Sequence, residues 1–573
     1  MITPRITQEA IADVPLLMYV MQERLGYDEI LDQVSPGHKN WQGLSVGKTM
    51  VTWLAHILSE HNHYMSHVQD WVAQLPQLWA GMWGQAVRPL DVSDDRLAEV
   101  VRRLSLSEVW EPLERQITQR MIRVYELSSE RVRLDTTTAK VYGGNELSVL
   151  FQRGHSKDHR PDLRQLKVML AALDPLGVLV GADVVSGNTA DDGLYVPMIA
   201  RLRSTLPSKG LLYIGDCKMG ALATRAFVAQ TENFYLMPLA QVGDLPEQLE
   251  KWVDDAVRGK VRLQPVWEVD GKTRLGEGYE HRRRLSAETE TGTVTWQERV
   301  LIVRSAAYAK AAVRNLHQRL AQAQAALRAL TPPRGRGQRQ FIDALALQTA
   351  VDAILERYAV KGLLTVTLQQ ETERRTVRAY RHATARQEER QRYLVQVKEN
   401  RTRLRTLEPR LGWRVYATNA PVRKLPLGPA VLAYRQEWLV ERNCARLKGR
   451  TLSLAPLWVR RDDHALGLTR LLTLAARVLA VAEYQVRRTL AQDDRTLVGL
   501  YPGQPTRGTA QPTTERLLRA FKTVSLTLVQ KGSQIFYLLP PLSELQRTIL
   551  HDLACPSNLY HRWFPKSWKP LRI

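Results

Sequence analysis

The hydrophobic pattern of the chain changes its period near residue 129. Before that point, apolar residues recur at helical spacing, for example over 14–21, 50–58 and 97–113. We therefore expect residues 1–128 to form a helical N-terminal domain.

After residue 129 the apolar runs become short and rich in Val, Leu and Thr, which is typical of strands. The pattern predicts strands at 132–138, 166–173 and 177–185, a helix at 191–206, a strand at 211–214 and a helix at 221–231. Short strands that alternate with helices predict an α/β domain.

The next part of the chain has a looser pattern. A strand-like run at 293–303 precedes an Ala- and Gln-rich helical pattern at 306–330. We expect the charged run at 374–405 to be a solvent-facing helix, with a DNA-binding stripe as the alternative. The α/β pattern then resumes at 413–419.

The predicted organisation is a helical region (1–128), a first core segment (129–237), a mixed, partly β insertion (238–408), a second core segment (409–490) and a basic C-terminal region (491–573).

Composition adds a binding preference. The chain has 573 residues, of which 44% are hydrophobic and 14 are Trp, so it can bury a large core. Its 81 Lys and Arg exceed its 58 Asp and Glu, which gives a formal net charge of +23. An excess of this sign and size favours a polyanionic partner, and nucleic acid above all.

The cysteine content and the hydropathy of the chain indicate in which cellular compartment to expect the protein. The three cysteines form no C-x-x-C pair, so we expect neither a zinc finger nor a disulfide framework, and a reducing cytoplasm fits. The first residues show no apolar signal core. The best apolar run, 471–484, is interrupted by Arg477 and is too short to span a bilayer. A membrane role is therefore not expected.

The aromatic and cationic tail at 560–570 has two interpretations. Its Trp, Tyr and Phe residues alternate with Lys and Arg, a pattern that can stack on bases and pair with phosphates. The same residues can instead pack on a neighbouring domain, and the sequence does not separate the two.

Three acidic residues occupy positions suited to metal binding. Asp135 lies within the first predicted strand, Asp216 follows the strand at 211–214, and Glu441 lies on a predicted helix. At about 100° per residue, Tyr434, Glu441 and Lys448 share one helical stripe about 60° wide. Glu437 lies on the same stripe.

This residue set suits phosphoryl transfer. Two divalent ions about 4 Å apart can activate an oxygen nucleophile and neutralise the leaving oxygen. Mg²⁺ and Mn²⁺ prefer carboxylate oxygens. Three carboxylates, with water and DNA phosphate, suffice for two such ions.

With these residues in place, the chain resembles the DDE transposases of bacterial insertion sequences. The resemblance is to the IS-four-like branch, whose catalytic helix reads Tyr, two residues, Arg, three residues, Glu, six residues, Lys. Tyr434, Glu441 and Lys448 keep those intervals, whereas Glu437 stands at the Arg position. The matching stretches also include 135–138, 154–165, 186–191 and the strand that ends at Asp216.

The resemblance implies an RNase H-like catalytic core, with an insertion before the catalytic helix. It implies that Asp135, Asp216 and Glu441 hold two Mg²⁺ or Mn²⁺ ions and that Tyr434 and Lys448 contact DNA phosphate. It also implies binding of double-stranded DNA at terminal inverted repeats and at the target, by a homodimer that brings two ends together. Glu437 cannot contact phosphate directly as Arg would, so it either pairs with a nearby Arg or helps to bind metal.

The polar loop at 155–159 has two interpretations. His155, Lys157, Asp158 and His159 lie between two predicted core strands. They either form an ordinary polar turn or orient water or phosphate near the acidic residues.

Three functions remain open. The first is a transposase that cleaves DNA and joins it to a target. The second is a catalytically inactive DNA-binding relic, which the Glu437 substitution suggests. The third is an RNase H-like nuclease without a joining step. The sequence does not give the repeat sequence, the target preference or whether cleavage passes through a DNA hairpin.

Overall fold

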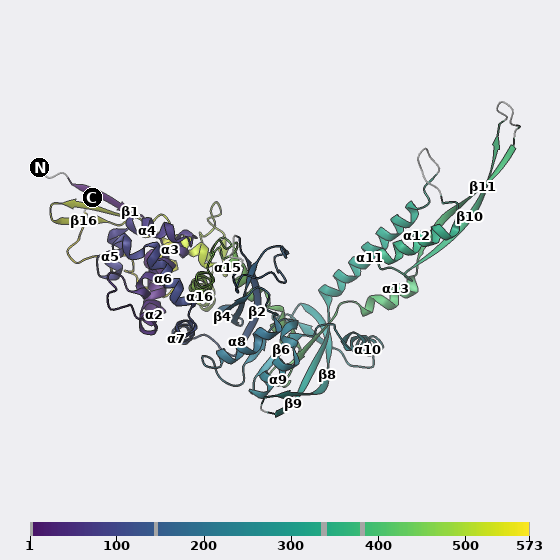
Figure 1. The fold of residues 1–573 in the computed structure, drawn as a ribbon, viewed down its shortest axis with the longest axis horizontal. Helices are drawn as coiled ribbons and strands as arrows, with labels where there is room; N and C mark the ends of the chain where they lie inside the picture. Colours follow the sequence, from purple (N-terminus) through teal and green to yellow (C-terminus); the bar gives the residue numbers. More distant parts are fainter. Residues whose placement is uncertain are drawn as a thin grey trace. The chain divides into compact units, whose positions relative to one another are not determined.

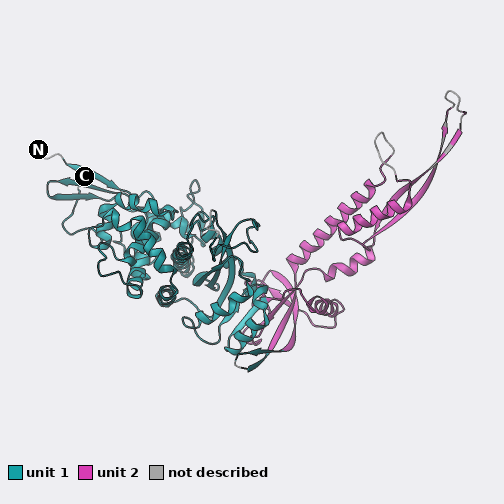
Figure 2. Ribbon diagram, viewed as in Figure 1, with its two compact units in different colours: residues 1–237, 285–296, 433–573 teal, residues 238–284, 297–432 magenta. Residues whose placement is uncertain are grey.

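The computed structural model describes residues 4–142, 147–290, 292–333, 341–378, 384 and 386–571, and its fold is mixed α/β (Figure 1). The chain forms two compact units, each described by itself below (Figure 2). Unit 1 comprises Met1–Met237, Leu285–Trp296 and Ala433–Ile573, and unit 2 comprises Pro238–Arg284 and Gln297–Leu432. The five predicted segments do not map onto units one to one, and their boundaries stay a prediction.

A mixed sheet forms the centre of unit 1. Its strands are β2 (Arg131–Lys140), β3 (Gln165–Leu173), β4 (Val178–Ser186), β5 (Leu212–Ile214) and β6 (Phe234–Pro238), in the order β4-β3-β2-β5-β6. β2, β3 and β4 are antiparallel, whereas β5 runs parallel to β2 and β6 runs parallel to β5. Every residue of β3 is buried, including Gln165 and Lys167, so the strand is covered on both faces.

Helices connect the parallel strands. α8 (Tyr195–Leu202) lies between β4 and β5, and α9 (Leu222–Gln230) lies between β5 and β6. The predicted alternation of strands and helices over residues 131–230 is confirmed, with boundaries shifted by a few residues.

The N-terminal region is helical, as predicted, apart from one strand. Its helices are α1 (Val14–Met18), α2 (Tyr27–Val34), α3 (Val46–Glu60), α4 (Met65–Ala73), α5 (Pro76–Trp83), α6 (Asp94–Ser105) and α7 (Ser107–Tyr125), with a π-helical turn at Tyr19–Arg24 and a 3₁₀ turn at Pro89–Val92. The strand is β1 (Arg5–Glu9), which pairs with β15 (Leu526–Lys531) near the other end of the chain.

α16 (Asp462–Gln492) is the main core helix of unit 1. The apolar run at 471–484 lies inside this helix of 31 residues, and Arg477 is accommodated in the core because its guanidinium is fully buried and pairs with Glu114 on α7. By length and composition this described helix could span a bilayer, but 94% of its apolar window is buried inside the protein. Burial of this kind also occurs in core helices of proteins that cross no membrane.

The C-terminal region packs against the N-terminal helices. It contains β13 (Leu497–Val498), β14 (Gly508–Thr509), α17 (Thr514–Arg519), β15, β16 (Gln534–Leu538), α18 (Glu544–Asp552) and β17 (Lys569–Pro570). Trp563 and Trp568 in the tail are each only 8% exposed, and the Tyr560 hydroxyl donates to the Ala12 carbonyl. These aromatics are packed within the protein, so the packing interpretation of the tail is the one the structure supports.

Unit 2 contains a strand-rich part and a helical part. Its elements are α10 (Leu245–Val257), β7 (Gln264–Trp267), the first part of β8 (Arg274–Thr289), the last part of β9 (Gly292–Ser305), α11 (Ala306–Ala329), α12 (Ala344–Arg357), β10 (Leu364–Val377), β11 (Arg386–Glu399), α13 (Arg401–Leu407), a 3₁₀ turn (Glu408–Arg410) and β12 (Trp413–Thr418). α14 (Leu427–Arg435) begins in this unit. Leu316 and Leu320 of α11 share a core with Leu347 and Val351 of α12.

The predicted charged helix at 374–405 is wrong. Most of this run forms the antiparallel hairpin of β10 and β11, and only α13 at its end is helical. Its charges pair across the strands, as in Arg374 with Glu389 (2.7 Å) and Arg392 with Glu371 (2.9 Å). Such cross-strand pairs stabilise a hairpin, and they are invisible to a search for helical periodicity.

Candidate active site

Strand register places Asp135 and Asp216 next to each other. In the parallel pair of β2 and β5, Arg133 lies opposite Ile214. Asp135 and Asp216 each lie two residues further along, so they occupy neighbouring positions, Asp135 within β2 and Asp216 just past the end of β5. Neighbouring strands are separated by about 4.8 Å, which brings the two carboxylates within electrostatic range.

The Asp135 carboxylate is partly buried, with 23% of its side chain exposed. Lys157 Nζ lies 3.2 Å from its Oδ1, and the Thr136 amide donates to the same oxygen (2.7 Å). Burial raises the pKa of Asp135, Lys157 opposes this rise, and the charge of Asp216 adds to it. The polar loop at 155–159 therefore contributes a cation directly to Asp135, which favours its functional interpretation.

The Asp216 carboxylate begins a short turn after β5. Its Oδ1 accepts hydrogen bonds from the Tyr195 hydroxyl (2.6 Å) and from the Lys218 amide (2.9 Å). Burial, followed by the charges of Asp216 and Asp135, raises the pKa of Tyr195, so the hydroxyl stays protonated and donates. Tyr195 could not be predicted as a site residue, because a buried tyrosine on the apolar side of α8 carries no functional signal in the sequence.

The single predicted helix that carries Tyr434 to Lys448 is wrong: α14 ends at Arg435 and α15 (Trp438–Lys448) begins three residues later. The break is caused by a contact with a distant part of the chain. The buried Arg133 guanidinium pairs with Asp174 and also donates to the Ala433 carbonyl. In a continuous helix that carbonyl would accept from the Glu437 amide, which instead donates to Tyr434 (3.2 Å).

Glu437 and Glu441 lie in different surroundings. Burial raises the pKa of Glu437, and the charges of Asp135 and Glu441 raise it further, against the opposing effects of Arg133 and a Tyr434 hydrogen bond. Glu437 is therefore half-buried near Asp135. Glu441 is exposed, and it forms no ion pair or side-chain hydrogen bond with residues in the described part of the chain.

The packing of α15 explains this difference. Its Asn443 side chain donates to the Gly177 carbonyl (2.8 Å), and Val440 and Leu447 are buried. At about 100° per residue, Glu437 lies nearer to this buried face than Glu441, which is turned about 40° further towards solvent.

The two predicted phosphate contacts have protein partners. Lys448 Nζ pairs with Asp158 Oδ1 of the polar loop (2.5 Å), and this lysine is 22% exposed. Tyr434 is only 9% exposed. Their contact with DNA stays a prediction, since binding would require Lys448 to exchange Asp158 for phosphate and Tyr434 to gain access.

The acidic side chains do not form a preformed metal-binding site. Within the described ranges, no group of three or more His, Cys, Asp or Glu is arranged to hold an ion. The donor type nevertheless fits, because Asp135, Asp216 and Glu437 supply only the hard oxygen ligands that Mg²⁺ and Mn²⁺ prefer. Burial raises the pKa of both Asp135 and Glu437, and neighbouring acids raise it further: Asp216 for Asp135, and Asp135 with Glu441 for Glu437. A divalent cation bound there would relieve this repulsion.

Comparisons with known proteins give a distant structural likeness. No protein-family model matches the sequence, and no curated protein matches it. Among solved structures, the chain shows a likeness to the cryo-EM structure of a piggyBac transposase synaptic complex with hairpin DNA. The TM-score is 0.36 with 7% sequence identity, over 96% of this chain and 86% of that chain.

Proposed function

We propose that this protein is a DNA transposase of the DDE type. The observation that carries the proposal is the register of β2 and β5, which sets Asp135 beside Asp216. The sheet order β4-β3-β2-β5-β6, with α15 following in the same unit, supports an RNase H-like core. The substrate is double-stranded DNA, cleaved at transposon ends and joined to a target.

The proposed cofactor is a pair of Mg²⁺ or Mn²⁺ ions, which would supply an activated oxygen nucleophile and a stabilised leaving oxygen. Asp135 and Asp216 would hold them, with a third carboxylate from α15. The resemblance assigns that role to Glu441, whereas the packing of α15 favours Glu437. Lys157 neutralises Asp135 in the protein alone and would turn to a DNA phosphate once an ion replaces it.

The net charge of +23 supports DNA as the partner. Binding that neutralises many phosphates should weaken steeply with salt, with a slope of about −0.9 per contacted phosphate. The proposed active form is a homodimer, because two transposon ends must be brought together. The proposed location is the cytoplasm, on the nucleoid.

A strand-transfer assay with Asp135→Ala tests the proposal. The variant should bind DNA and yet lose both Mg²⁺-dependent cleavage and joining. Asp255→Asn, which removes a surface carboxylate paired with Lys260 in unit 2, is the matched control and should behave as wild type. Wild-type levels of joining by Asp135→Ala would refute the proposal.

Two other outcomes separate the alternatives. DNA binding without any metal-dependent cleavage by the wild-type protein would identify an inactive relic, which Glu437 at the signature Arg position motivates. Hydrolysis without joined products would identify a nuclease of the same fold.

A further inference from the structure

The hydroxyl of Tyr195 is buried in unit 1 and bonds to one oxygen of a candidate metal ligand. Tyr195 is the first residue of α8 and is only 1% exposed. Its hydroxyl donates to Asp216 Oδ1 (2.6 Å), and the Lys218 amide donates to the same oxygen (2.9 Å). Asp216 Oδ2 accepts no hydrogen bond from the residues that the structure describes. The two oxygens of this carboxylate therefore differ, because the protein uses Oδ1 and leaves Oδ2 for another partner.

The tyrosine ring is held in place by its surroundings. Gly215 follows β5 and has no side chain, and a Cβ there would lie 3.2 Å from Tyr195 Cε1. Lys167 on β3 pairs with Asp191 (2.6 Å) shortly before α8 begins, and the Lys167 side chain is only 6% exposed. This buried ion pair fixes the start of α8 to the sheet. A side chain locked by packing holds its hydrogen-bond partner in a set orientation.

A carboxylate fixed in this way suits some divalent ions better than others. Mg²⁺ demands near-octahedral geometry, keeps several waters and takes few protein oxygens. Ca²⁺ takes more oxygens in a flexible geometry, and these can include both oxygens of one carboxylate. Because two donors already use Asp216 Oδ1, chelation through both oxygens of Asp216 is disfavoured. Binding through Oδ2 alone remains open, which favours Mg²⁺ over Ca²⁺.

We propose that Tyr195 is a positioning residue that sets the metal preference of the candidate active site, by holding Asp216 so that a divalent ion binds through Oδ2 alone. This inference rests on the proposed function, which assigns the ions to Asp135, Asp216 and a carboxylate of α15. It adds a structural reason for the ion to be Mg²⁺ or Mn²⁺ and not Ca²⁺. Tyr195 acts through Asp216 and needs no contact with DNA.

Metal binding to the full-length protein in the absence of DNA tests the inference. Bound Mn²⁺ is measured by the loss of the electron paramagnetic resonance signal of the free ion, and Mg²⁺ and Ca²⁺ are measured by competition with Mn²⁺. Tyr195→Phe keeps the ring and removes only the hydroxyl. It should lower the affinity for Mg²⁺ and Mn²⁺ by about 10- to 100-fold. The affinity for Ca²⁺ should fall much less, because the freed Oδ1 becomes available for chelation.

Tyr213→Phe is the matched control. Tyr213 lies on β5, is fully buried, and its hydroxyl has no hydrogen-bond partner among the described residues. This substitution removes the same chemical group next to the same strand and leaves the bonds of Asp216 intact. The affinities for all three ions should therefore stay as in the wild-type protein. Thermal unfolding in chelator should give melting temperatures within a few degrees of wild type for both variants.

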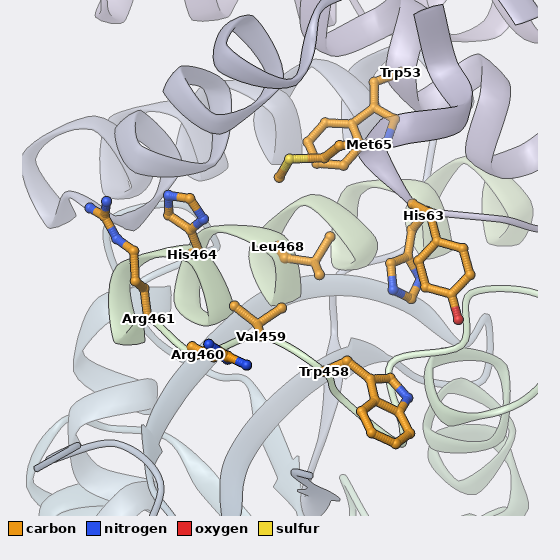
Figure 3. Close-up of a pocket in the computed structure, with 10 residues that line it drawn as sticks. Trp53, His63, Met65, Trp458, Val459, Arg460, Arg461, His464 and Leu468 are labelled. Carbon is orange, nitrogen blue, oxygen red and sulfur yellow. The ribbon is translucent and has the colours of Figure 1, made fainter. Parts of the chain in front are cut away.

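A pocket elsewhere in unit 1 provides a control for Mn²⁺ bound at another place. Its volume is about 330 Å³, and its lining includes the imidazoles of His63 and His464 but no carboxylate (Figure 3). Figure 3 shows these imidazoles on opposite sides of Leu468, so they are not placed to share an ion. His464→Ala should leave Mn²⁺ binding unchanged, whereas Asp135→Ala should abolish it. Mn²⁺ binding that survives Asp135→Ala would place the ion elsewhere and overturn the inference.

The result for Tyr195 is separable from the result for the proposed function. If Tyr195→Phe leaves the preference for Mg²⁺ over Ca²⁺ unchanged, the inference is refuted, even where all affinities fall together, because an equal fall is what a purely structural role predicts. The proposed function would then still stand if the wild-type protein cleaves DNA with Mg²⁺. A narrowed preference in Tyr195→Phe, with wild-type behaviour of Tyr213→Phe, would support the positioning role.

Discussion

The charged residues on the two sides of α15 are arranged in opposite ways: on one side they form ion pairs, and on the other side acidic residues lie close together. On the side facing α16 and α17, Arg442 and Arg446 pair with the buried carboxylate of Glu483, and Arg446 also lies 3.0 Å from Glu515. On the side facing β2, Glu437 lies among acidic residues, with the buried Arg133 and the Lys157 ammonium as the nearby cations.

The pKa shifts follow this contrast. Burial alone would raise the pKa of Glu515, but pairing with Arg446 outweighs burial and lowers it. For Asp135 and Glu437, burial and neighbouring acids raise the pKa together. The first side therefore stabilises the fold, whereas the second gathers acidic residues that repel one another, with Lys157 paired to Asp135 alone among them. Retained repulsion of this kind is common where a protein binds cations or performs catalysis.

Removing a carboxylate from the acidic group near Asp135 should have the largest effect on activity. Asp216→Asn should reduce metal-dependent cleavage and joining by about a thousand-fold or more, because it removes a proposed ligand of the ions. Its melting temperature should stay within a few degrees of wild type. A strand-transfer assay alongside thermal unfolding checks both expectations. Substantial residual joining by this variant would show that the carboxylate is dispensable.

Removing an ion pair from the opposite side of α15 should instead reduce the stability of the fold. Arg446→Ala leaves Glu483 and Glu515 with one fewer buried partner, and we expect a loss of about 3–5 kcal/mol in the free energy of unfolding. Arg450→Ala, at the exposed end of the same segment, should change that free energy by no more than about 0.5 kcal/mol. Denaturant unfolding measures both variants. Equal losses in the free energy of unfolding would show that the buried ion pairs of Arg446 stabilise the fold no more than an exposed arginine does.

Metal-binding measurements can distinguish the roles of the two carboxylates Glu437 and Glu441. Titration with Mn²⁺, followed by the rise in melting temperature, should show an affinity at least about tenfold weaker for Glu437→Gln than for wild type. Glu441→Gln, the matched variant one turn away, should bind Mn²⁺ nearly as wild type does. The opposite ranking would assign the metal to Glu441, as the family resemblance implies.

The smallest expected effect is on stability as a function of pH. The folded-state pKa of Glu437 is raised above its ordinary value of 4.5, so the folded protein favours the protonated form. The stabilisation from this group is complete below pH 4.5 and is lost as the pH rises through the raised pKa. In chelator, Glu437→Gln should therefore be about 1 kcal/mol more stable than wild type near pH 7.

The advantage of Glu437→Gln should disappear as the pH falls below 4.5. Melting temperatures across this range, with Glu441→Gln measured in parallel, check the sign. A variant less stable than wild type at neutral pH would show that the Glu437 charge is satisfied in the fold.

Part of this structure could be read from the sequence because its cause is local. The short, mostly apolar run at 166–173 predicts a strand, which is β3, and the alternation over 131–230 predicts α/β architecture. The hairpin of β10 and β11 could not be predicted in this way, because its charged residues are paired with residues on the opposite strand. The break before α15 also escaped prediction, since it depends on Arg133, three hundred residues away from Ala433 in the chain.

The sequence by itself determined which acids are candidates, the strand and helix that carry them, and the cationic excess that favours DNA. Spacing along the chain, however, treats Glu437 and Glu441 as equal members of one helical stripe. Only the tertiary structure separates them, because α15 packs its Val440 and Leu447 face inwards, which leaves Glu437 half-buried near Asp135 and turns Glu441 towards solvent.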